Sequence, residues 1–288
     1  MKTLRSMLFM PGNNPGMLVS ADILDADAII YDLEDAVALD QKDAARDLVA
    51  NALENLTFEN SLVTVRINPI DSPYWQEDLD AILKDKLDGI VIPKASVKSV
   101  KEVEAYVKDR CRQLGIENKF SFYILVESTM GIIKLDKIVE ASEKIDGILL
   151  GGEDYSLDLG VERTEDSDEL RYARYRIATV AKAYGINAID TPYTDIDNEE
   201  GLVKDTKFVK TIGFNGRLIV GPRQVPILNK IFSPSKEEIE NARAILKLVE
   251  KANKEGLGVF SFKGKMVDKP VIARAEKMIK AASEWGLI

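Results

Sequence analysis

The sequence contains no histidine and only one cysteine, Cys111, in 288 residues. The absence of histidine excludes Ser-His triads, Cys-His dyads, imidazole bases and most zinc sites. A single cysteine cannot form an internal disulfide, and an unpaired thiol in a chain of this size favours a reducing compartment. We therefore expect a cytoplasmic protein whose acid–base chemistry depends on carboxylates, lysine or tyrosine.

The sequence also lacks long apolar runs and an excess of positive charge. Its first residues contain only a four-residue apolar run before Pro11, which is too short for the core of a signal peptide or for a membrane span. The 39 Lys and Arg residues are outnumbered by 48 Asp and Glu residues, which gives a net charge of −9. Nucleic acid and anionic membranes attract the opposite charge balance, so we expect neither as a partner.

Eight short apolar segments recur along the chain, with amphipathic segments between them. Their continuous apolarity is typical of parallel strands that helices cover on both faces. The segments are residues 6–10, 28–33, 62–67, 89–93, 122–127, 147–151, 187–190 and 217–221. Eight strand–helix units predict an α/β fold, a (β/α)₈ TIM barrel over residues 1–232, with a doubly wound open sheet as the alternative. No Gly-x-Gly-x-x-Gly or phosphate-loop lysine follows any strand, which weakens that alternative.

Helix-start signals lie between these segments at Asn14, Asp40, Ser96 and Asp197. In the helix predicted after Ser96, Cys111 falls on the apolar stripe. This position indicates a buried structural thiol and not a nucleophile.

Residues 233–288 form a C-terminal extension with its own helix signals. Ser235 with Glu238 predicts the start of a long helix, a strand-like segment covers 258–268, and a last helix starts at Pro270. No linker rich in Pro, Gly or Ser separates this extension from the barrel. We therefore expect it to pack on the barrel or on a neighbouring subunit.

Polar side chains end most of the predicted strands, at the end that carries the active site in (β/α)₈ barrels. These residues are Asp32, Glu34, Asp35, Arg66, Asn68, Lys94, Glu127, Glu153, Asp154 and Asp190. Carboxylates that converge on one rim repel each other, and a bound cation is the simplest way to keep them charged.

The missing histidine and the core position of the cysteine leave oxygen ligands, which suit Mg²⁺ or Mn²⁺ better than zinc or copper. Glu127 and Asp154, on consecutive strands, are the expected metal ligands. The alternative is a structural ring of charges, in which the acids only pair with Arg66, Lys94 and Arg5.

Cations on the same rim are candidates for binding a substrate that carries a carboxylate. Arg66 is the strongest because a guanidinium holds a carboxylate through two parallel hydrogen bonds, whereas Lys94 supplies a point charge. Arg5 is a further candidate. The backbone at Gly12 is also expected near the ligand, although an ordinary turn glycine explains this residue equally well.

Seven motifs match a known family, in order and over nearly the whole chain. They are LRSMLFMPGNNPGM (4–17), YDLEDAVALDQKDAAR (31–46), VRIN (65–68), LGGEDYSLDLG (150–160), DTPYTDIDNEEG (190–201), a pattern over 213–225 that ends GPRQV, and GKMVDKP (264–270). Together they resemble the citrate lyase β-subunit family, part of the HpcH/HpaI aldolase/citrate lyase family. That wider family also holds malyl-, methylmalyl- and citramalyl-CoA lyases.

The resemblance implies a (β/α)₈ barrel with a C-terminal extension, Mg²⁺ on Glu127 and Asp154, and Arg66 beside the metal. It implies a carbon–carbon lyase that cleaves a citryl thioester, on CoA or on an acyl carrier protein, into oxaloacetate and an acetyl thioester. Such a cleavage needs a Lewis acid, a base for the hydroxyl group and stabilisation of the departing enolate. The resemblance further implies a homo-oligomer, a trimer or hexamer, and citrate lyase α and γ subunits as possible partners.

Two further acids are catalytic candidates. Asp268 lies in GKMVDKP, where the resemblance implies a carboxylate that reaches a neighbouring subunit's active site and handles the proton at the acetyl carbon. The alternative for Asp268 is an ordinary helix N-cap. Glu34, with Asp35, is expected to support the site by contacting the metal's waters or Arg5 and Lys42.

Three alternatives stay open at this point. Gly221 stands where family members commonly carry Asn or His before Pro-x-Gln, so a malyl-, methylmalyl- or citramalyl-CoA lyase remains the second hypothesis. A Schiff-base aldolase using Lys94 is less favoured, because a rim rich in carboxylates keeps an amine protonated and leaves less free amine. A non-catalytic binding subunit would be expected to lack the ligands that this rim retains.

Overall fold

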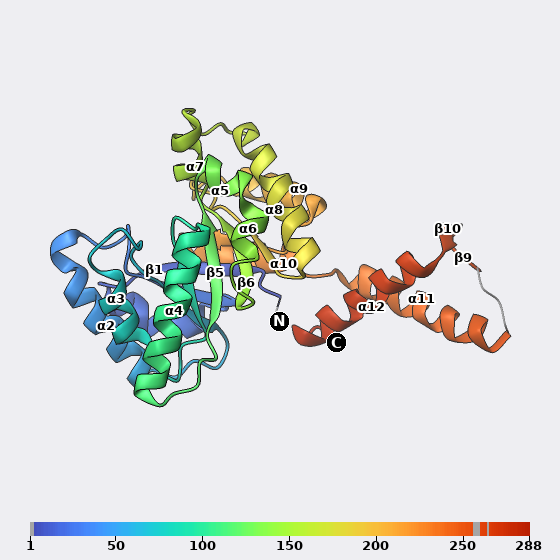
Figure 1. Ribbon diagram of the computed structural model, residues 1–288. Helices are drawn as coiled ribbons and strands as arrows, with labels where there is room; N and C mark the ends of the chain where they lie inside the picture. The colour runs from blue at the N-terminus through green and yellow to red at the C-terminus, as the bar shows by residue number, and fades with distance from the viewer. Residues whose placement is uncertain (1–2, 256–259, 264) are drawn as a thin grey trace. The chain divides into compact units, whose positions relative to one another are not determined.

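Eight parallel strands close into a barrel in the order β1 to β8, as predicted. The computed structural model that contains them describes residues 3–255, 260–263 and 265–288 (Figure 1). The strands are β1 (Ser6–Pro11), β2 (Ala28–Asp32), β3 (Leu62–Arg66), β4 (Gly89–Ile92), β5 (Ser121–Val126), β6 (Ile145–Leu150), β7 (Asn187–Asp190) and β8 (Gly216–Ile219). Because β1 also pairs with β8, the barrel has no open edge, and the doubly wound alternative is wrong.

Helices follow the strands and surround the barrel (Figure 1). They are α1 (Pro15–Ser20), α2 (Lys42–Asn55), α3 (Trp75–Ile82), α4 (Val97–Leu114), α5 (Thr129–Ile133), α6 (Leu135–Val139), α7 (Gly152–Leu159), α8 (Arg171–Tyr184), α9 (Glu199–Ile212) and α10 (Val225–Phe232). Short 3₁₀ turns lie between them, namely η1 (Ala21–Leu24), η2 (Leu39–Gln41), η3 (Asp168–Leu170) and η4 (Pro222–Gln224). Cys111 is buried on α4, as its place in the apolar stripe predicted.

The helix starts agree with the prediction at two positions and differ at two others. Asn14 and Ser96 accept hydrogen bonds from the first turns of α1 and α4, as predicted. The prediction for Asp40 is wrong, because η2 leads directly into α2 without a side-chain cap. The prediction for Asp197 is also wrong, because the next residue, Asn198, accepts from the first turn of α9.

The barrel interior is filled by apolar side chains from alternate positions of the strands. This cluster contains Leu4, Met7, Phe9, Ala28, Ile30, Leu62, Val91, Tyr123, Leu125, Leu149, Ile189 and Leu218. Because side chains along a strand change face with a period of two, the next inward positions after Ile30 and Leu125 belong to Asp32 and Glu127. The same alternation takes β3 from Leu62 to Arg66. The fold therefore sets these three polar groups above the apolar core, at the carboxyl end of the barrel.

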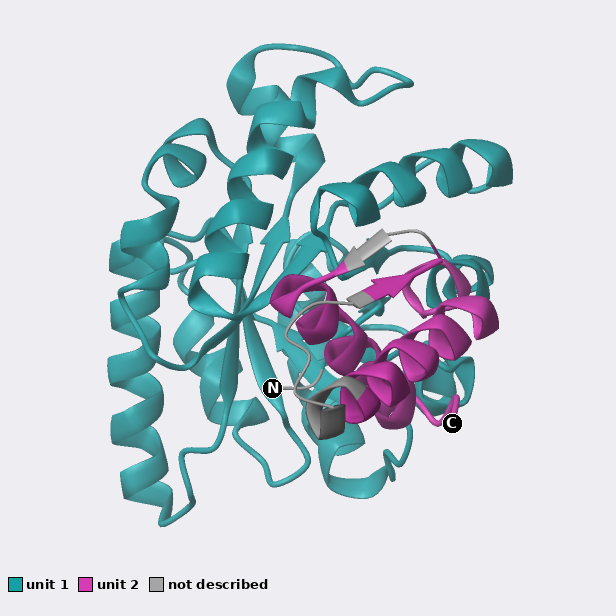
Figure 2. Cartoon of the chain, turned by 90° about the vertical axis from the view of Figure 1, so that its right-hand side faces the viewer, with its two compact units in different colours: residues 1–229 teal, residues 230–288 magenta. Residues whose placement is uncertain are grey.

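The chain divides into two compact units, Met1–Asn229 and Lys230–Ile288, which are coloured separately in Figure 2. The second unit contains α11 (Lys236–Glu255), β9 (Phe260–Phe262), β10 (Lys265–Val267) and α12 (Lys269–Glu284). Within it, α11 packs against α12, and β9 pairs antiparallel with β10. Residues 258, 259 and 264 of the predicted strand-like segment lie outside the described residues. The packing of this unit on the barrel or on another subunit stays a prediction.

Two cap predictions in this unit agree with the structure. Ser235 and Glu238 form a capping box at the start of α11: the Ser235 N–H donates to Glu238 Oε2 at 2.7 Å, and the Glu238 N–H donates to Ser235 Oγ at 3.1 Å. Asp268 is the N-cap of α12, where its Oδ1 accepts from the Val271 N–H at 3.2 Å. The structure therefore confirms the helix-cap alternative for Asp268, and its catalytic role stays a prediction.

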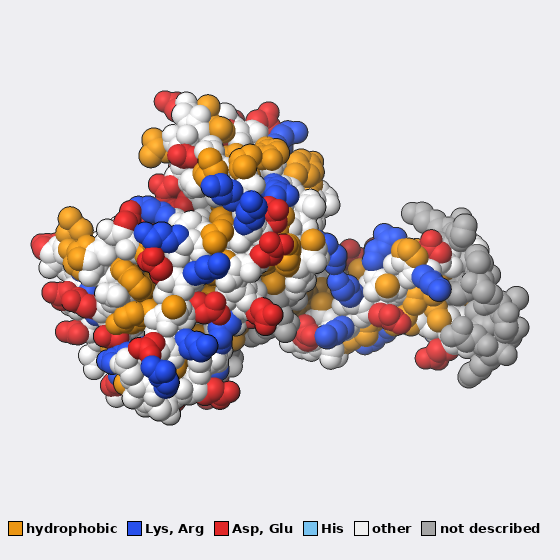
Figure 3. Space-filling view, viewed as in Figure 1, with side chains coloured by type: hydrophobic (Ala, Val, Ile, Leu, Met, Phe, Trp, Pro, Cys, Tyr) orange, Lys and Arg blue, Asp and Glu red, His pale blue; other side chains and the backbone are white. Residues whose placement is uncertain are grey.

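The surface carries charges of both signs. On the face shown in Figure 3, Lys and Arg side chains are interspersed with Asp and Glu side chains. Among the described residues, no helix combines the length and the apolarity needed to cross a membrane.

Candidate active site

Asp32 and Arg66, the last residues of β2 and β3, form a buried ion pair at the carboxyl end of the barrel. Arg66 Nε donates to Asp32 Oδ1 at 2.7 Å, and Nη2 donates to Oδ2 at 2.6 Å. The same carboxylate accepts the backbone N–H groups of Glu34 and Ala36 at 2.9 and 3.0 Å. The guanidinium carbon lies 4.8 Å from the ring centroid of Phe9 on β1. Asp32 therefore fixes both the guanidinium and the loop that follows β2.

Glu34 faces the remaining edge of that guanidinium. Its Oε2 lies 3.0 Å from Arg66 Nη1 but accepts no hydrogen bond in the described part of the chain, although the residue is only 4% exposed. Burial raises the pKa of Glu34 to about 7 against the opposing charge of Arg66, and the carboxylates of Asp35 and Asp32 contribute to the rise. A carboxyl group with this pKa can accept or release a proton at neutral pH.

Asp35 is exposed, and its Oδ2 lies 3.5 Å from Arg66 Nη1. Glu34 and Asp35 of the DLEDAV motif therefore face Arg66, and the contacts predicted for them with Arg5 and Lys42 are not formed through their carboxylates. Lys42 instead donates to the carbonyl oxygens of Leu33 and Glu34, each at 2.7 Å. Lys42 therefore binds the backbone of the loop, and the Glu34 carboxylate faces the barrel mouth.

Asn68 of the VRIN motif, two residues after the end of β3, supports the same loop. Its Nδ2 donates to the Leu33 carbonyl at 2.9 Å and to Asp78 Oδ2 at 2.7 Å, and its N–H donates to the same Asp78 oxygen at 2.9 Å. Arg46, the last residue of the DLEDAVALDQKDAAR motif, donates to the other oxygen of Asp78 at 3.1 Å. Asp78 on α3 thus joins the two motifs in one hydrogen-bonded network that also holds the loop before Glu34.

Glu127 and Asp154 are brought together, although Asp154 lies on α7 and not on a strand as predicted. Glu127 follows β5 and is 5% exposed, and Asp154 lies within hydrogen-bonding reach of its carboxyl group from the first turn of α7. Burial raises the pKa of Glu127 well above its usual range, and the contact with Asp154 raises it further. Glu127 is buried whereas Asp154 is exposed, and the repulsion between two carboxylates in contact is relieved by either a shared proton or a cation.

Lys94 contributes its backbone to this pair. Its N–H donates to Glu127 Oε1 at 2.6 Å. Lys94 has a φ angle of 46°, in the left-handed region that is costly for residues other than glycine, and its side chain is exposed. The contact of its ammonium group with substrate stays a prediction.

Two glycines allow α7 to begin beside Glu127. A Cβ on Gly151 would lie 2.8 Å from the Glu127 Cβ, and a Cβ on Gly152 would lie 2.6 Å from Thr191 Oγ1. The GGED sequence therefore has no side chains at the two positions where β5 and β7 approach the backbone, and Asp154 follows two residues later.

Arg5 is not part of this site, which corrects the prediction that it binds substrate. Arg5 precedes β1 and pairs with Asp27, which precedes β2, through Nη2 and Oδ1 at 2.6 Å. Both residues lie at the amino end of the parallel strands, opposite the end that carries Arg66 and Glu127.

Gly12 lies at the carboxyl end of β1, the end that carries the candidate site, but close packing is enough to explain why this residue is a glycine. Its N–H donates to the Asp32 carbonyl at 2.8 Å. A Cβ there would lie 2.7 Å from that oxygen and would also contact Leu33 and Val49. These contacts account for the glycine without a ligand, and its contact with substrate stays a prediction.

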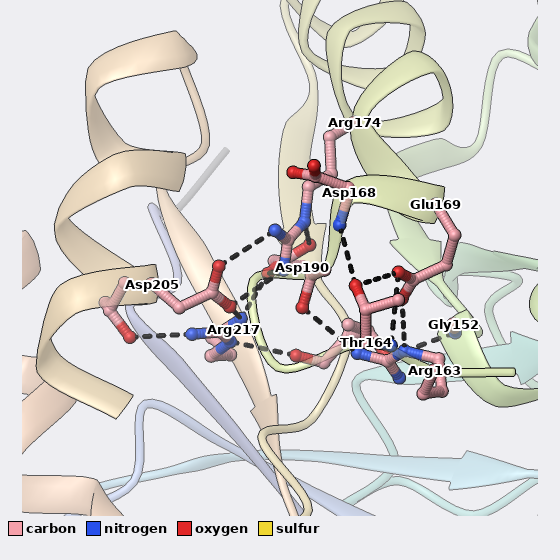
Figure 4. A network of polar contacts seen from close by, with 12 residues as sticks. Gly152, Arg163, Thr164, Asp168, Glu169, Arg174, Asp190, Asp205 and Arg217 are labelled. Atoms are coloured by element: carbon pink, nitrogen blue, oxygen red, sulfur yellow. Dashed lines mark hydrogen bonds and ion pairs between the residues drawn. The ribbon is translucent and has the colours of Figure 1, made fainter. Parts of the chain in front are cut away.

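The acid at the end of β7 belongs to a buried ionic cluster and not to the barrel mouth. Asp190 accepts from Arg174 on α8 at 2.9 and 3.0 Å and from Arg217 on β8 at 2.6 Å (Figure 4). Asp205 on α9 pairs with the same two arginines. For Asp190, the alternative of a structural charge pair is therefore correct, and sequence reasoning missed both arginine partners.

In the described part of the chain, no group of three or more acidic, His or Cys side chains lies close enough to hold a metal ion. Any cation at the barrel mouth would therefore rest on the pair Glu127 and Asp154, with water or substrate oxygens completing its shell. Mg²⁺ commonly binds in this way, through one or two carboxylates.

The model of the HpcH/HpaI aldolase/citrate lyase family matches residues 5–222. The chain belongs to this family. Citrate lyase subunit beta of Leuconostoc mesenteroides subsp. cremoris is 39% identical over 286 residues, which cover 99% of this chain and 95% of the relative. The L-malyl-CoA/beta-methylmalyl-CoA lyase of Rhodobacter capsulatus is 31% identical, over 96% of this chain and 94% of the relative.

A solved structure of this family has a similar fold. The protein CitE from Mycobacterium tuberculosis, crystallised with magnesium, acetoacetate and coenzyme A, superposes with a TM-score of 0.77. The two chains are 30% identical, and the alignment covers 96% of this chain and 97% of the other. The likeness thus extends over the C-terminal extension as well as the barrel.

Proposed function

We propose that this chain is a Mg²⁺-dependent carbon–carbon lyase that cleaves a citryl thioester into oxaloacetate and an acetyl thioester. One observation carries the proposal: the barrel mouth brings Arg66, Glu34 and the pair Glu127 and Asp154 together above an apolar core. The similarity to citrate lyase β subunits over nearly the whole chain supports this choice of substrate.

The residues present fit a magnesium ion. Glu127 is buried against Asp154, and Glu34 Oε2 is buried without a hydrogen bond among the described residues. Buried carboxylates without enough donors are costly unless a cation compensates them. We assign Glu127 and Asp154 as the ligands, with Glu34 near the ligand waters, and Mn²⁺ as a substitute ion.

The cleavage reverses an aldol-type addition. A base removes the proton from the tertiary hydroxyl group, that oxygen becomes the ketone of oxaloacetate, and the electron pair of the broken C–C bond forms the enolate of the acetyl thioester. Protonation of the enolate carbon then gives the acetyl thioester. Magnesium, when bound, supplies Lewis acidity to the oxaloacetate half.

Arg66 binds the substrate carboxylate in this proposal. Asp32 occupies the Nε and Nη2 side of the guanidinium, so the Nη1 edge that faces Glu34 is the one that can donate to a ligand. Asp32 keeps the Arg66 guanidinium in one orientation, and burial strengthens the hydrogen bonds that this guanidinium donates.

Glu34 is the proposed base for the hydroxyl group. Its pKa of about 7 allows the carboxylate form at neutral pH and still gives a base of useful strength. Asp268 is the proposed acid for the enolate carbon, delivered by the C-terminal unit of a neighbouring chain. The Lys94 ammonium group is proposed to attract the anionic substrate.

The proposal includes a cytoplasmic location and a homo-oligomer, a trimer or hexamer, so that Asp268 of one chain serves the barrel of another. The thioester carrier is CoA or an acyl carrier protein, and citrate lyase α and γ subunits are the proposed partners in the latter case.

A malyl-, methylmalyl- or citramalyl-CoA lyase is the second candidate. Gly221, after β8, has φ and ψ of −127° and 123°, which any residue adopts. A Cβ there would have an ordinary contact of 3.6 Å with Ile196. Neither the backbone conformation nor the packing therefore requires a glycine at this position. The space that a larger side chain would fill at the rim is open to a different substrate.

The test is an assay of purified protein with citryl-CoA, citryl acyl carrier protein, malyl-CoA and citramalyl-CoA, with Mg²⁺ or with EDTA. We expect oxaloacetate from the citryl thioester in Mg²⁺, loss of activity in EDTA and recovery with Mg²⁺ or Mn²⁺. Full activity in EDTA would contradict the metal assignment, and preference for malyl-CoA or citramalyl-CoA would favour the second candidate. Borohydride with a keto acid should trap no adduct, because the mechanism forms no imine.

A further inference from the structure

A hydrogen bond joins the first turn of α7 to the residue that follows β7. The Gly152 N–H donates to Thr191 Oγ1 at 3.0 Å, and Thr191 is fully buried. Gly152 is the first residue of α7, and Asp154 lies in the same turn. The hydroxyl group of Thr191 therefore holds the backbone from which Asp154 projects.

Thr191 is itself held by the buried ionic cluster of Arg174, Asp190, Asp205 and Arg217. Arg217 Nε donates to the Thr191 carbonyl at 2.9 Å, and Arg217 Nη2 donates to Asp190, the preceding residue, at 2.6 Å. Figure 4 shows Arg174, Asp190, Asp205 and Arg217 together, with Gly152 close by. The cluster thus gives Thr191 a fixed position relative to β8, α8 and α9.

The junction before Asp154 is also held from the opposite side. The Gly151 N–H donates to the Val126 carbonyl at 3.0 Å, and Val126 precedes Glu127. Two backbone donors in succession therefore join the start of α7 to β5 on one side and to β7 on the other. The β5 contact fixes the distance to Glu127, and the β7 contact fixes the direction in which the first turn of α7 runs.

We propose that Thr191 is a positioning residue for metal binding: its hydroxyl group, anchored by Arg217, orients the first turn of α7 so that Asp154 meets Glu127 in ligand geometry. This inference rests on the proposed function, in which those two carboxylates hold the metal. Thr191 lies in the DTPYTDIDNEEG motif, but sequence reasoning assigned its hydroxyl group no role, because that role depends on contacts among β7, β8 and α7.

The experiment compares Thr191→Val, which keeps the shape but removes the acceptor, with Thr191→Ser, which keeps the hydroxyl group. Thr191→Ala is the second variant without a hydroxyl group, in case the valine protein does not fold. The matched control is Thr64→Val, since Thr64 on β3 is also fully buried and its hydroxyl donates one hydrogen bond, to the Ile29 carbonyl at 2.8 Å. Binding is measured with Mn²⁺ alone, from the loss of the free-ion electron paramagnetic resonance signal.

We expect Thr191→Val and Thr191→Ala to bind Mn²⁺ about tenfold more weakly or worse, as for other residues that orient metal ligands, and Thr191→Ser to bind nearly as the wild type does. Thr64→Val should have a lower melting temperature than the wild type but the same affinity for Mn²⁺. If Thr191→Val and Thr191→Ala both bind Mn²⁺ with wild-type affinity while Glu127→Ala does not bind it, the positioning role of Thr191 is wrong but the proposed metal site stands. A wild-type protein that binds neither Mn²⁺ nor Mg²⁺ would overturn the metal-dependent function, and this inference with it.

Discussion

Two opposing effects act on the same side chains at the barrel mouth. Burial favours the neutral form of Glu34, whereas the guanidinium of Arg66 favours the carboxylate, and burial is the larger effect on the pKa. Arg66 stays charged because Asp32 holds it through two hydrogen bonds despite its burial. The pair therefore places a permanent cation beside a carboxyl group that titrates near neutral pH.

The first prediction concerns Arg66→Lys. An ammonium group cannot keep both hydrogen bonds to Asp32 and still present an N–H edge to Glu34, so we expect kcat/KM to fall by roughly 2–4 kcal/mol in transition-state stabilisation. Steady-state kinetics with the citryl thioester measure it, and Arg171→Lys at an exposed pair is the control. A variant that keeps more than about a third of wild-type kcat/KM would assign Arg66 a structural role only.

The second prediction concerns the pH dependence of stability. Because the folded-state pKa of Glu34 lies above the unfolded value, its contribution to stability is fully present below about pH 4.5 and is lost as the pH rises through about 7. In EDTA, we expect wild-type protein to lose on the order of 2 kcal/mol more than Glu34→Gln between pH 5 and pH 8. Urea unfolding at each pH measures this difference.

Glu169→Gln is the control for that experiment. Hydrogen bonds from Thr164 and Arg163 lower the pKa of Glu169 despite its burial, so its contribution is lost only as the pH falls below the usual carboxyl range. Its slope between pH 5 and pH 8 should match that of the wild type. Equal slopes for the wild type and Glu34→Gln would show that Glu34 is already charged at pH 5.

At the scale of elements, the start of α7 connects the end of β5 to the end of β7. The glycine pair before Asp154 lets β5 and β7 approach the backbone, and the cluster behind Thr191 ties β7 and β8 to α8 and α9. In the cluster, Arg174 and Arg217 are no more than 1% exposed and share the carboxylates of Asp190 and Asp205. Two cations and two anions compensate each other, so removal of one leaves a buried charge.

The third prediction follows for Arg217→Met. One remaining guanidinium cannot neutralise both carboxylates, so we expect the free energy of unfolding to fall by about 3–5 kcal/mol. Arg112→Met, at a pair whose arginine is 81% exposed, should cost less than about 1 kcal/mol. Chemical denaturation of both variants measures the contrast. Equal losses would mean that the cluster contributes no more than a surface ion pair.

At the scale of the whole molecule, the barrel and the C-terminal unit are two compact bodies on one chain. The barrel carries Arg66, Glu34, Glu127 and Asp154, whereas Asp268 is the N-cap of α12 in the other unit. Under the proposed mechanism, a complete active site therefore needs the polar residues of a barrel and Asp268 of a C-terminal unit.

The fourth prediction uses Asp268→Asn. Asparagine caps a helix as well as aspartate, so the melting temperature should change little, while the rate should fall on the order of a hundredfold through loss of proton transfer. Mixing this variant with Glu127→Ala should restore some activity, because subunit exchange creates sites with both residues intact. Mixed oligomers that remain inactive would place Asp268 in its own chain's site or outside the chemistry.

The sequence alone determined the eight strands and the polar rim. Continuous apolar runs indicate strands covered on both faces, and the polar residues that end those runs mark the carboxyl end of the barrel. These rules depend only on neighbours along the chain. Arg5 was also decidable in this way, because it precedes its strand and so lies at the amino end.

Only the tertiary structure decided which acids are held in ion pairs away from the candidate site and which face it. Asp190 ends a strand as Asp32 does, yet helices α8 and α9 bring Arg174 and Asp205 against it from distant parts of the chain. Burial raises the pKa of Glu34, while Asp35 next to it is exposed. Charge pairing and desolvation depend on which segments pack together, whereas strand and helix patterns depend on local spacing, and this difference separates what the sequence determined from what it did not.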